Sequence, residues 1–87
     1  MNVLQYIKQN YDSFTDREKL IADYLIETKE RIISMSARDI AEATKTSAPT
    51  VVRFAKKIGF NTLNELKLNY LLILAKKRKQ ELYNFNI

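Results

Sequence analysis

The only proline and the only glycine of the chain lie close together, at Pro49 and Gly59. Proline is tolerated in the first turn of a helix, and glycine readily adopts the left-handed conformation that often follows a helix end. Ser47, just before this proline, is of a type preferred at the N-cap. These three residues predict a helix that begins after Ser47 and ends at Gly59. Because the rest of the chain lacks the residues that usually form hairpins, we expect an all-α fold.

Apolar residues recur at helical spacing in four other segments, so the sequence predicts a five-helix bundle. The expected helices cover residues 2 to about 11, 16 to about 28, 37–44 and 63 to about 82. Capping pairs mark where three of them begin: Thr15 with Glu18, Ser36 with Asp39, and Thr62 with Glu65. Residues 31–35 are expected to be a connection that packs against the core. A chain of 87 residues can bury one core, so 1–87 is expected to be a single domain.

The same periodicity predicts which side of each helix is buried. In the second helix the expected apolar stripe is Leu20, Ile21, Tyr24 and Leu25. In the third helix, Ile40 and Ala43 are expected to face inward. In the fourth helix the expected buried face is Val51, Phe54, Ala55 and Ile58. The opposite side of the fourth helix is left for solvent or for a ligand.

Several classes of function are disfavoured by the residues that the chain lacks. It contains no Cys and no His, which removes disulfides, Cys/His zinc sites and imidazole-based triads. Asp39 and Glu42 stand beside basic residues, as solvated helix charges do. We therefore expect no enzyme activity, no metal and no cofactor. The start lacks the pattern of a signal peptide, and the longest apolar run, residues 70–75, is far shorter than the roughly 20 residues that span a bilayer, so a cytoplasmic protein without a membrane partner is expected.

Positive charge is concentrated in the second half of the chain. Residues 1–43 contain six Lys or Arg and eight Asp or Glu, whereas residues 44–87 contain nine Lys or Arg and two Asp or Glu. The formal net charge of +5 therefore comes from the half that contains the fourth helix. A basic half-domain is typical of a phosphate-rich partner, although a charge run is often only a solvated face.

The third and fourth expected helices, joined by the short turn Lys45-Thr46, have the pattern of a helix-turn-helix. In that motif the second helix lies in the DNA major groove, so double-stranded DNA is the expected partner. Arg53 could bind a guanine edge or a phosphate, and Lys56 and Lys57 fit phosphate contacts better. The residues expected to face DNA are Arg38, Lys45, Ser47, Ala48, Pro49, Thr50, Val52, Arg53, Lys56 and Lys57. For Arg38 and Lys45 a solvated surface charge is an equal alternative.

The last helix has more apolar residues than one small core needs. Its main stripe is Leu63, Leu66, Tyr70, Ile73 and Leu74. A further set, Leu68, Leu71, Leu72 and Ala75, predicts a surface that pairs two copies as a homodimer. An alternative function is therefore a helical dimerisation or protein-interaction module without DNA binding. A membrane-surface helix over residues 63–79 fits less well, because its basic residues bunch at one end.

Five stretches carry a resemblance to a known family: residues 15–25, 40–43, 47–54, 56–60 and 65–67. They resemble the N-terminal domain of RpiR-type bacterial transcriptional regulators, most specifically in TVVRF at 50–54 followed by KKIGF at 56–60. The resemblance implies a DNA-binding domain that controls sugar-metabolism genes. It also implies that a phosphosugar effector would bind a C-terminal sugar isomerase-like domain, which is absent from these residues.

The turn departs from the family's pattern. The family usually has Gly and an apolar residue where this chain has Lys45 and Thr46. If Lys45 adopts a left-handed conformation, its Cβ costs about 1 kcal/mol. The geometry of the turn is therefore expected to be the feature that local sequence specifies least.

Overall fold

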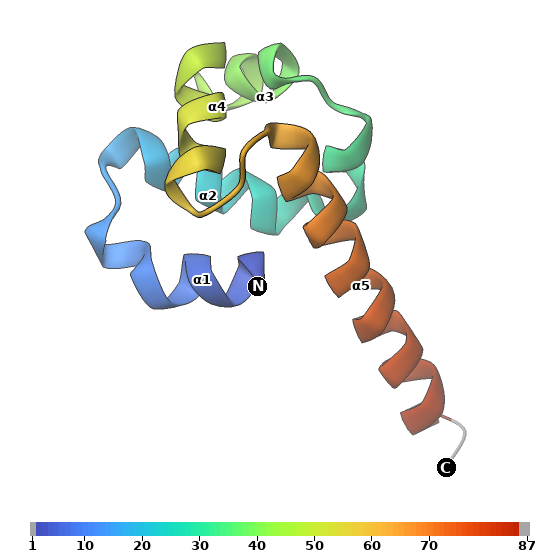
Figure 1. The fold of residues 1–87 in the computed structure, drawn as a ribbon. Helices are drawn as coiled ribbons and strands as arrows, with labels where there is room; N and C mark the ends of the chain where they lie inside the picture. Colours follow the sequence, from blue (N-terminus) through green and yellow to red (C-terminus); the bar gives the residue numbers. More distant parts are fainter. Residues whose placement is uncertain (1, 86–87) are drawn as a thin grey trace.

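Five α-helices and two short 3₁₀ helices form the structure, a computed structural model that describes residues 2–85 and their side chains through residue 80. The α-helices are α1 (Val3–Asn10), α2 (Asp16–Thr28), α3 (Ala37–Thr44), α4 (Ala48–Lys57) and α5 (Leu63–Phe85). The 3₁₀ helices are η1 (Tyr11–Ser13) and η2 (Lys29–Ser34), and the described residues include no strand. In Figure 1, α3 and α4 lie together at one side of the molecule and α1 lies at the other, beyond α2. The prediction of an all-α domain with five helices is confirmed.

Two boundaries differ from the sequence-based expectation. The last helix continues to Phe85. Residues 31–34 of the expected connection are instead part of the 3₁₀ helix η2, in which Ile32 is fully buried. The backbone N–H of Met35 donates to the Ile32 carbonyl at 3.1 Å, so this segment satisfies its polar groups locally while it covers the core. The expectation that it packs against the core is confirmed.

The core lies between all four short α-helices, η2 and the first half of α5, and its members include Ile32 of η2 and Ile40 of α3. The face of α4 predicted to be buried is buried: Val51, Phe54, Ala55 and Ile58. The Phe54 ring packs edge-on against Phe14, with 5.3 Å between the ring centroids and 75° between the planes. Such a T-shaped contact is a favourable geometry for two aromatic rings. It joins α4 to the segment before α2.

Two predicted core positions are wrong. Leu20 is 47% exposed, because α2 turns Ile21, Ala22 and Leu25 toward the core. Ala43 is exposed as well, and the neighbouring Thr44 is buried in its place. The Thr44 hydroxyl donates to the Ile40 carbonyl at 2.8 Å, so a polar side chain is buried with its hydrogen bond made.

Polar contacts attach the first half of α5 to the rest of the domain. The buried Tyr70 hydroxyl donates to the carbonyl of Leu25 in α2, and Lys67 donates to the carbonyl of Met35. The backbone N–H of Val3 donates to the Asn69 side chain at 3.1 Å. Burial raises the pKa of the Tyr70 hydroxyl, and the negative charge of Glu30 raises it further, so this donor keeps its proton.

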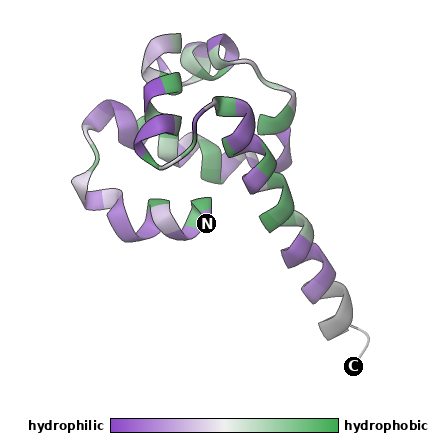
Figure 2. Ribbon diagram, in the orientation of Figure 1, coloured by the Kyte–Doolittle hydropathy of each residue, from purple (hydrophilic) through white to green (hydrophobic). Residues whose placement is uncertain are grey.

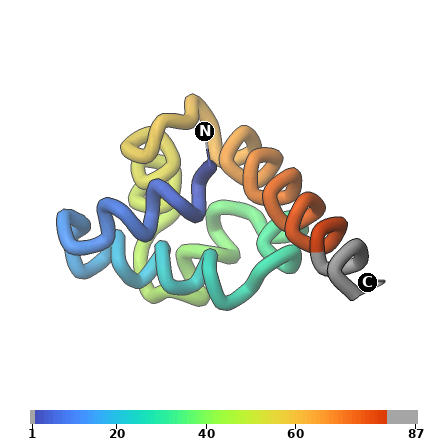
Figure 3. Tube along the Cα trace, turned by 90° about the horizontal axis from the view of Figure 1, so that it is seen from below, coloured from blue at the N-terminus to red at the C-terminus, as the bar shows by residue number. Residues whose placement is uncertain are grey.

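The second half of α5 extends away from this body, as Figure 1 shows from the side and Figure 3 from below. The domain is accordingly elongated, with principal extents of 45 × 26 × 21 Å. Figure 2 shows that the hydrophobic residues of α5 lie mainly in its first half and that the part beyond it is hydrophilic. The hydrophobic part of α5 therefore lies near the body of the domain, and its hydrophilic part extends away from it.

Candidate nucleic-acid interface

The helices α3 and α4 pack against each other through a small side chain. Ala41 is 5% exposed and Ile40 is fully buried, whereas the outer side of α4 is open to solvent. A larger residue at Ala41 would hold the two helices apart, because close approach of helices depends on the side chains at the crossing. The structure thus places α3 as a support behind α4.

The turn between these helices is left-handed at Lys45, with φ 56° and ψ 40°. The N–H of Thr46 donates to the Ala41 carbonyl at 2.9 Å, which closes the end of α3. The hydroxyls of Thr44 and Thr46 lie 2.9 Å apart. Since the single Thr44 proton is donated to the Ile40 carbonyl, Thr46 is the donor of this pair. These hydroxyl contacts lie on either side of the left-handed Lys45.

The N-terminal half of α4 carries a row of polar side chains, Ser47, Thr50 and Arg53, on its outer face. The Ser47 hydroxyl accepts from the Thr50 backbone N–H at 3.3 Å and lies 2.7 Å from the Thr50 hydroxyl. The Arg53 guanidinium donates to the Thr50 hydroxyl at 3.5 Å. The capping residue and the arginine are thus linked through Thr50, and the guanidinium is held along the open face of the helix.

The other predicted contact residues surround this row or flank it. Pro49 and Lys56 are exposed, and Ala48 and Val52 are partly exposed. Lys45 is exposed in the turn. The Arg38 side chain, on α3, is 86% exposed and forms an ion pair of 3.5 Å with Glu42, four residues on. Such exposed pairs within a helix are weak, so this one leaves Arg38 able to exchange partners.

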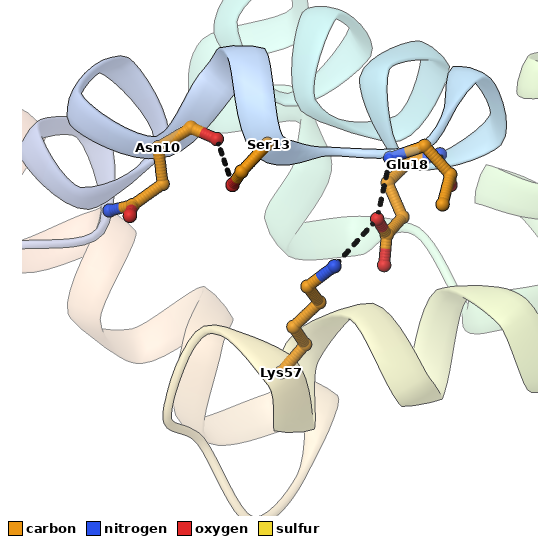
Figure 4. Close-up of polar contacts among 5 residues, drawn as sticks. Asn10, Ser13, Glu18 and Lys57 are labelled. Atoms are coloured by element: carbon orange, nitrogen blue, oxygen red, sulfur yellow. Dashed lines mark hydrogen bonds and ion pairs between the residues drawn. The ribbon is translucent and has the colours of Figure 1, made fainter.

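Lys57 differs from the other predicted contacts because it pairs with another helix. Its ammonium lies 2.9 Å from the Glu18 carboxylate, at the start of α2, and Figure 4 shows the side chain crossing from α4 to reach it. Burial alone would raise the pKa of Glu18, but hydrogen bonds from Lys57 and from the Thr15 N–H hold the pKa below its ordinary value. The Lys57 ammonium also lies 5.7 Å from the centre of the Phe14 ring, within cation–π range.

The sequence identified Glu18 as a helix cap but not as a partner of Lys57. The capping role is confirmed, because Glu18 accepts from the Thr15 N–H at 2.8 Å. The ion pair joins residues 39 positions apart in the chain, so no local sequence pattern predicts it. Contacts at that distance follow from how α2 and α4 pack.

The predicted pairing surface lies on the outer side of α5. Leu68 is 58% exposed, Leu72 54% and Leu71 41%, and Ala75 is also exposed. Exposed leucines this close together form an apolar patch of the kind that proteins cover with a partner. In Figure 1 the second half of α5 runs away from α4.

Neither a metal-binding cluster nor a bilayer-spanning helix occurs among residues 2–85. These residues contain no group of three or more acidic, His or Cys side chains placed to hold a metal ion. Within the same range, no helix combines the length and the apolar character that crossing a bilayer requires.

Comparison with known proteins gives a family match over most of the chain. A family model described as "Helix-turn-helix domain, rpiR family" matches residues 1–77. An uncharacterized HTH-type transcriptional regulator of Thermotoga maritima is 42% identical over 69 residues, which are 78% of this chain and 25% of that protein. One from Haemophilus influenzae is 36% identical over 80 residues, which are 92% of this chain and 28% of that protein.

A third relative has a different printed name. The "Bifunctional protein glk" of Paraburkholderia xenovorans is 35% identical over 66 residues, which are 76% of this chain but only 10% of that protein. The chain spans about a quarter of the length of the HTH-type regulators that it matches. No solved structure matches it.

Proposed function

We propose that this chain, which belongs to the rpiR family of helix-turn-helix domains, binds double-stranded DNA sequence-specifically as the DNA-binding part of a transcriptional regulator. The observation that carries the proposal is the open outer face of α4, where Ser47, Thr50 and Arg53 form a linked row. In helix-turn-helix proteins the N-terminal residues of the second helix approach the base edges. The family membership and the basic charge of residues 44–87 support the same function.

Within this interface we assign different tasks to different residues. Arg53 is proposed to bind a guanine edge or an adjacent phosphate, because its guanidinium is both exposed and held along α4. The side chains of Ala48, Pro49, Thr50 and Val52 would lie nearest the bases, with Ser47 as cap. Lys56 and Lys57 would contact phosphates, with Lys45 and Arg38 at the edge of the surface.

We also propose that the active form is a homodimer whose two α4 helices enter successive major grooves, about 34 Å apart. The exposed leucines of α5 support this, since a symmetric pair of domains requires a surface that recognises itself. The protein would act in the cytoplasm. Control of sugar-metabolism genes by a phosphosugar rests on the family resemblance, and the effector would bind a part of the full-length regulator outside residues 1–87.

The proposal is tested by selecting bound sequences from a pool of random duplexes. A sequence-specific dimer should enrich a two-fold symmetric motif, whose half-site spacing reports the distance between the two α4 helices. The affinity for the enriched site should fall steeply as salt rises, because phosphate contacts release counterions. If the protein bound no duplex from the pool at moderate salt, the alternative function, a helical protein-interaction module, would be favoured.

A further inference from the structure

Two apolar surfaces lie uncovered on the described part of the chain. One is a groove of about 480 Å³ between α1, the end of α2 and α5, and two of the predicted pairing residues, Leu71 and Ala75, are among its lining. The other is the outer side of α5. Ala75 therefore borders both surfaces. Each could receive a second copy of the chain, and the charges around them decide between the two.

The outer side of α5 has the spacing of a coiled-coil seam. Glu65, Leu68, Leu72, Ala75 and Lys79 follow one another at intervals of three and four residues, and all five are exposed. Residues at these intervals lie along one line of a helix and meet a partner helix as knobs in holes. We call these five residues the α5 seam. Its centre is apolar, and each end carries a charge.

The two ends of the α5 seam carry opposite charges. Glu65 is acidic and stands at the start, whereas the other end has Lys79 within the basic run 76–79. If two seams paired in parallel, Glu65 would lie beside Glu65 and the basic run beside the basic run, so like charges would repel. If they paired antiparallel, Glu65 of each copy would lie beside the basic run of the other, and opposite charges would attract.

We propose that two copies of the domain associate through antiparallel pairing of their α5 seams. This inference deepens the dimer of the proposed function and rests on it for its biological role. In this arrangement Leu68 of one copy packs opposite Leu72 of the other, and the two-fold axis crosses α5 near residue 70. The charges at the seam ends thus set the orientation, and the leucines supply the apolar contact.

The groove is disfavoured as the place where the partner's α5 binds. Its rim carries Lys8, Lys29, Lys77 and Arg78. The single acid among its lining residues, Glu30, is already within 3.7 Å of Arg78. A second α5 lying there would bring its own basic run against these cations, at a cost in free energy. The α5 seam, which offers an acid at the required end, has the complementary charge.

The paired seams would form a small interface. Its apolar part consists of two leucines and one alanine from each copy. Stable protein interfaces bury roughly 1,200 Å² or more, so a contact of this size is expected to be weak and reversible in the isolated domain. Binding of both copies to adjacent half-sites would strengthen it through their high effective concentration.

Cysteine cross-linking without DNA tests the orientation, since the chain contains no Cys of its own. Leu68→Cys and Leu72→Cys are prepared separately and oxidised alone or mixed. Antiparallel pairing separates identical positions by about 6 Å along the axis and places 68 opposite 72. The mixed disulfide should therefore form several times faster than either self-disulfide. Gln9→Cys, exposed on α1, is the control and should cross-link slowly. Faster self-disulfides at 68 and 72 would overturn the proposal in favour of parallel pairing.

Charge reversal tests the role of the seam ends by sedimentation equilibrium. Glu65→Lys and Lys76→Glu should each raise the dimer Kd by roughly fivefold, because pairing of 68 with 72 places Glu65 beside Lys76 of the other copy and each symmetric dimer then loses two exposed ion pairs. The double variant should return to near the wild-type Kd. Additive weakening in the double variant, or a wild-type protein that stays monomeric up to millimolar concentration, would overturn the proposal. Thermal unfolding of each variant separates these effects from loss of the Glu65 cap, which accepts from the Asn61 N–H at 2.9 Å.

These measurements need no DNA, so they fail independently of the proposed function. If the mixed 68–72 disulfide formed fastest but no duplex were enriched, the antiparallel pairing would stand and the proposal of DNA binding would be wrong. If a symmetric motif were enriched but the self-disulfides at 68 and 72 formed faster, the proposal of DNA binding would stand and the antiparallel pairing would be wrong.

Discussion

At the N-terminal end of α4, Ser47, Thr50 and Arg53 bond to one another within a single helix, whereas at the C-terminal end Lys57 bonds to Glu18 of α2. The first arrangement leaves the guanidinium on an open face, where a partner can reach it. The second uses a charged side chain to fix where α4 lies on α2. Residues of the same chemical class on one helix thus have different roles, and their partners distinguish them.

The largest expected effect is at the open end. Arg53→Ala should weaken binding to the selected site by about 1–3 kcal/mol, the usual range for an arginine that reads a base, and should weaken binding to random duplexes less. Fluorescence anisotropy with both duplexes measures the difference. Arg31→Ala removes an exposed arginine from η2 and is the matched control, with no change expected. Equal losses on both duplexes would reassign Arg53 to a phosphate.

The turn between α3 and α4 offers the next effect. Lys45→Gly should raise the free energy of unfolding by about 0.5–1 kcal/mol, because glycine has no Cβ to penalise the left-handed conformation. Urea denaturation measures this change. Lys45→Ala removes the same charge but keeps the Cβ, so it should give little or no stabilisation. If both variants were equally stabilised, the effect would come from charge, and strain at Lys45 would not be its source.

Lys56 and Lys57 are neighbours on α4, but only Lys57 forms a described ion pair with Glu18. Lys56→Ala should reduce the slope of log affinity against log salt by about one, as expected for one lost phosphate contact. Lys57→Ala should reduce it less, because the Lys57 ammonium is shared with Glu18. Salt titrations of the two variants in parallel give both slopes. An equal reduction for Lys57 would show that DNA phosphate displaces Glu18 from this lysine.

The smallest expected effect is on stability against pH. The folded pKa of Glu18 is lowered, so its contribution is present above the unfolded pKa and is lost as the pH falls through the folded value. The stability gap between the wild type and Glu18→Gln should therefore shrink between about pH 5 and pH 3. The carboxylate is partly exposed, so the gap should stay well below 1 kcal/mol at neutral pH.

The matched variant for this titration is Asp39→Asn. Asp39 caps α3 by accepting from the Ser36 N–H at 2.9 Å, which also lowers its pKa, but it lies in the other capping box, apart from the Lys57 pair. Lys57→Met should change the pH dependence of the stability gap for Glu18→Gln and leave the gap for Asp39→Asn unchanged. A change in both gaps would show that the two sites are coupled. A gap for Glu18→Gln that widened on acidification would contradict a lowered pKa for Glu18 in the folded state.

Features that depend on near neighbours in the chain were predicted well. The capping boxes at Thr15 and Ser36 and the N-cap at Ser47 occur where the sequence placed them, because a cap bonds to a backbone N–H only three residues away. The buried face of α4 followed from its spacing in the same way. The sequence left the conformation of Lys45 open, and the structure shows it to be left-handed.

Features that depend on the packing of helices against one another were predicted less well from the sequence. The choice between Ala43 and Thr44 as a buried residue of α3 could not be made from hydrophobicity, because Thr44 is admitted only by its hydrogen bond to Ile40. Leu20 met the helical spacing, but α2 turns Ile21, Ala22 and Leu25 toward the core and leaves Leu20 47% exposed. Thr44 is thus accommodated by hydrogen bonds within α3, whereas the packing of α2 against its neighbours decides that Leu20 stays outside the core.

Residue types alone were enough to predict the five α-helices, the caps at Thr15, Ser36 and Ser47, the basic half of the chain and the family. Each of these is written in residue types within a few positions of one another or in the chain's overall charge. Packing of the helices was needed to show that Lys57 pairs with Glu18 and that Leu68, Leu71 and Leu72 of α5 stay exposed. Those outcomes depend on the distances between segments, which form only when the helices pack.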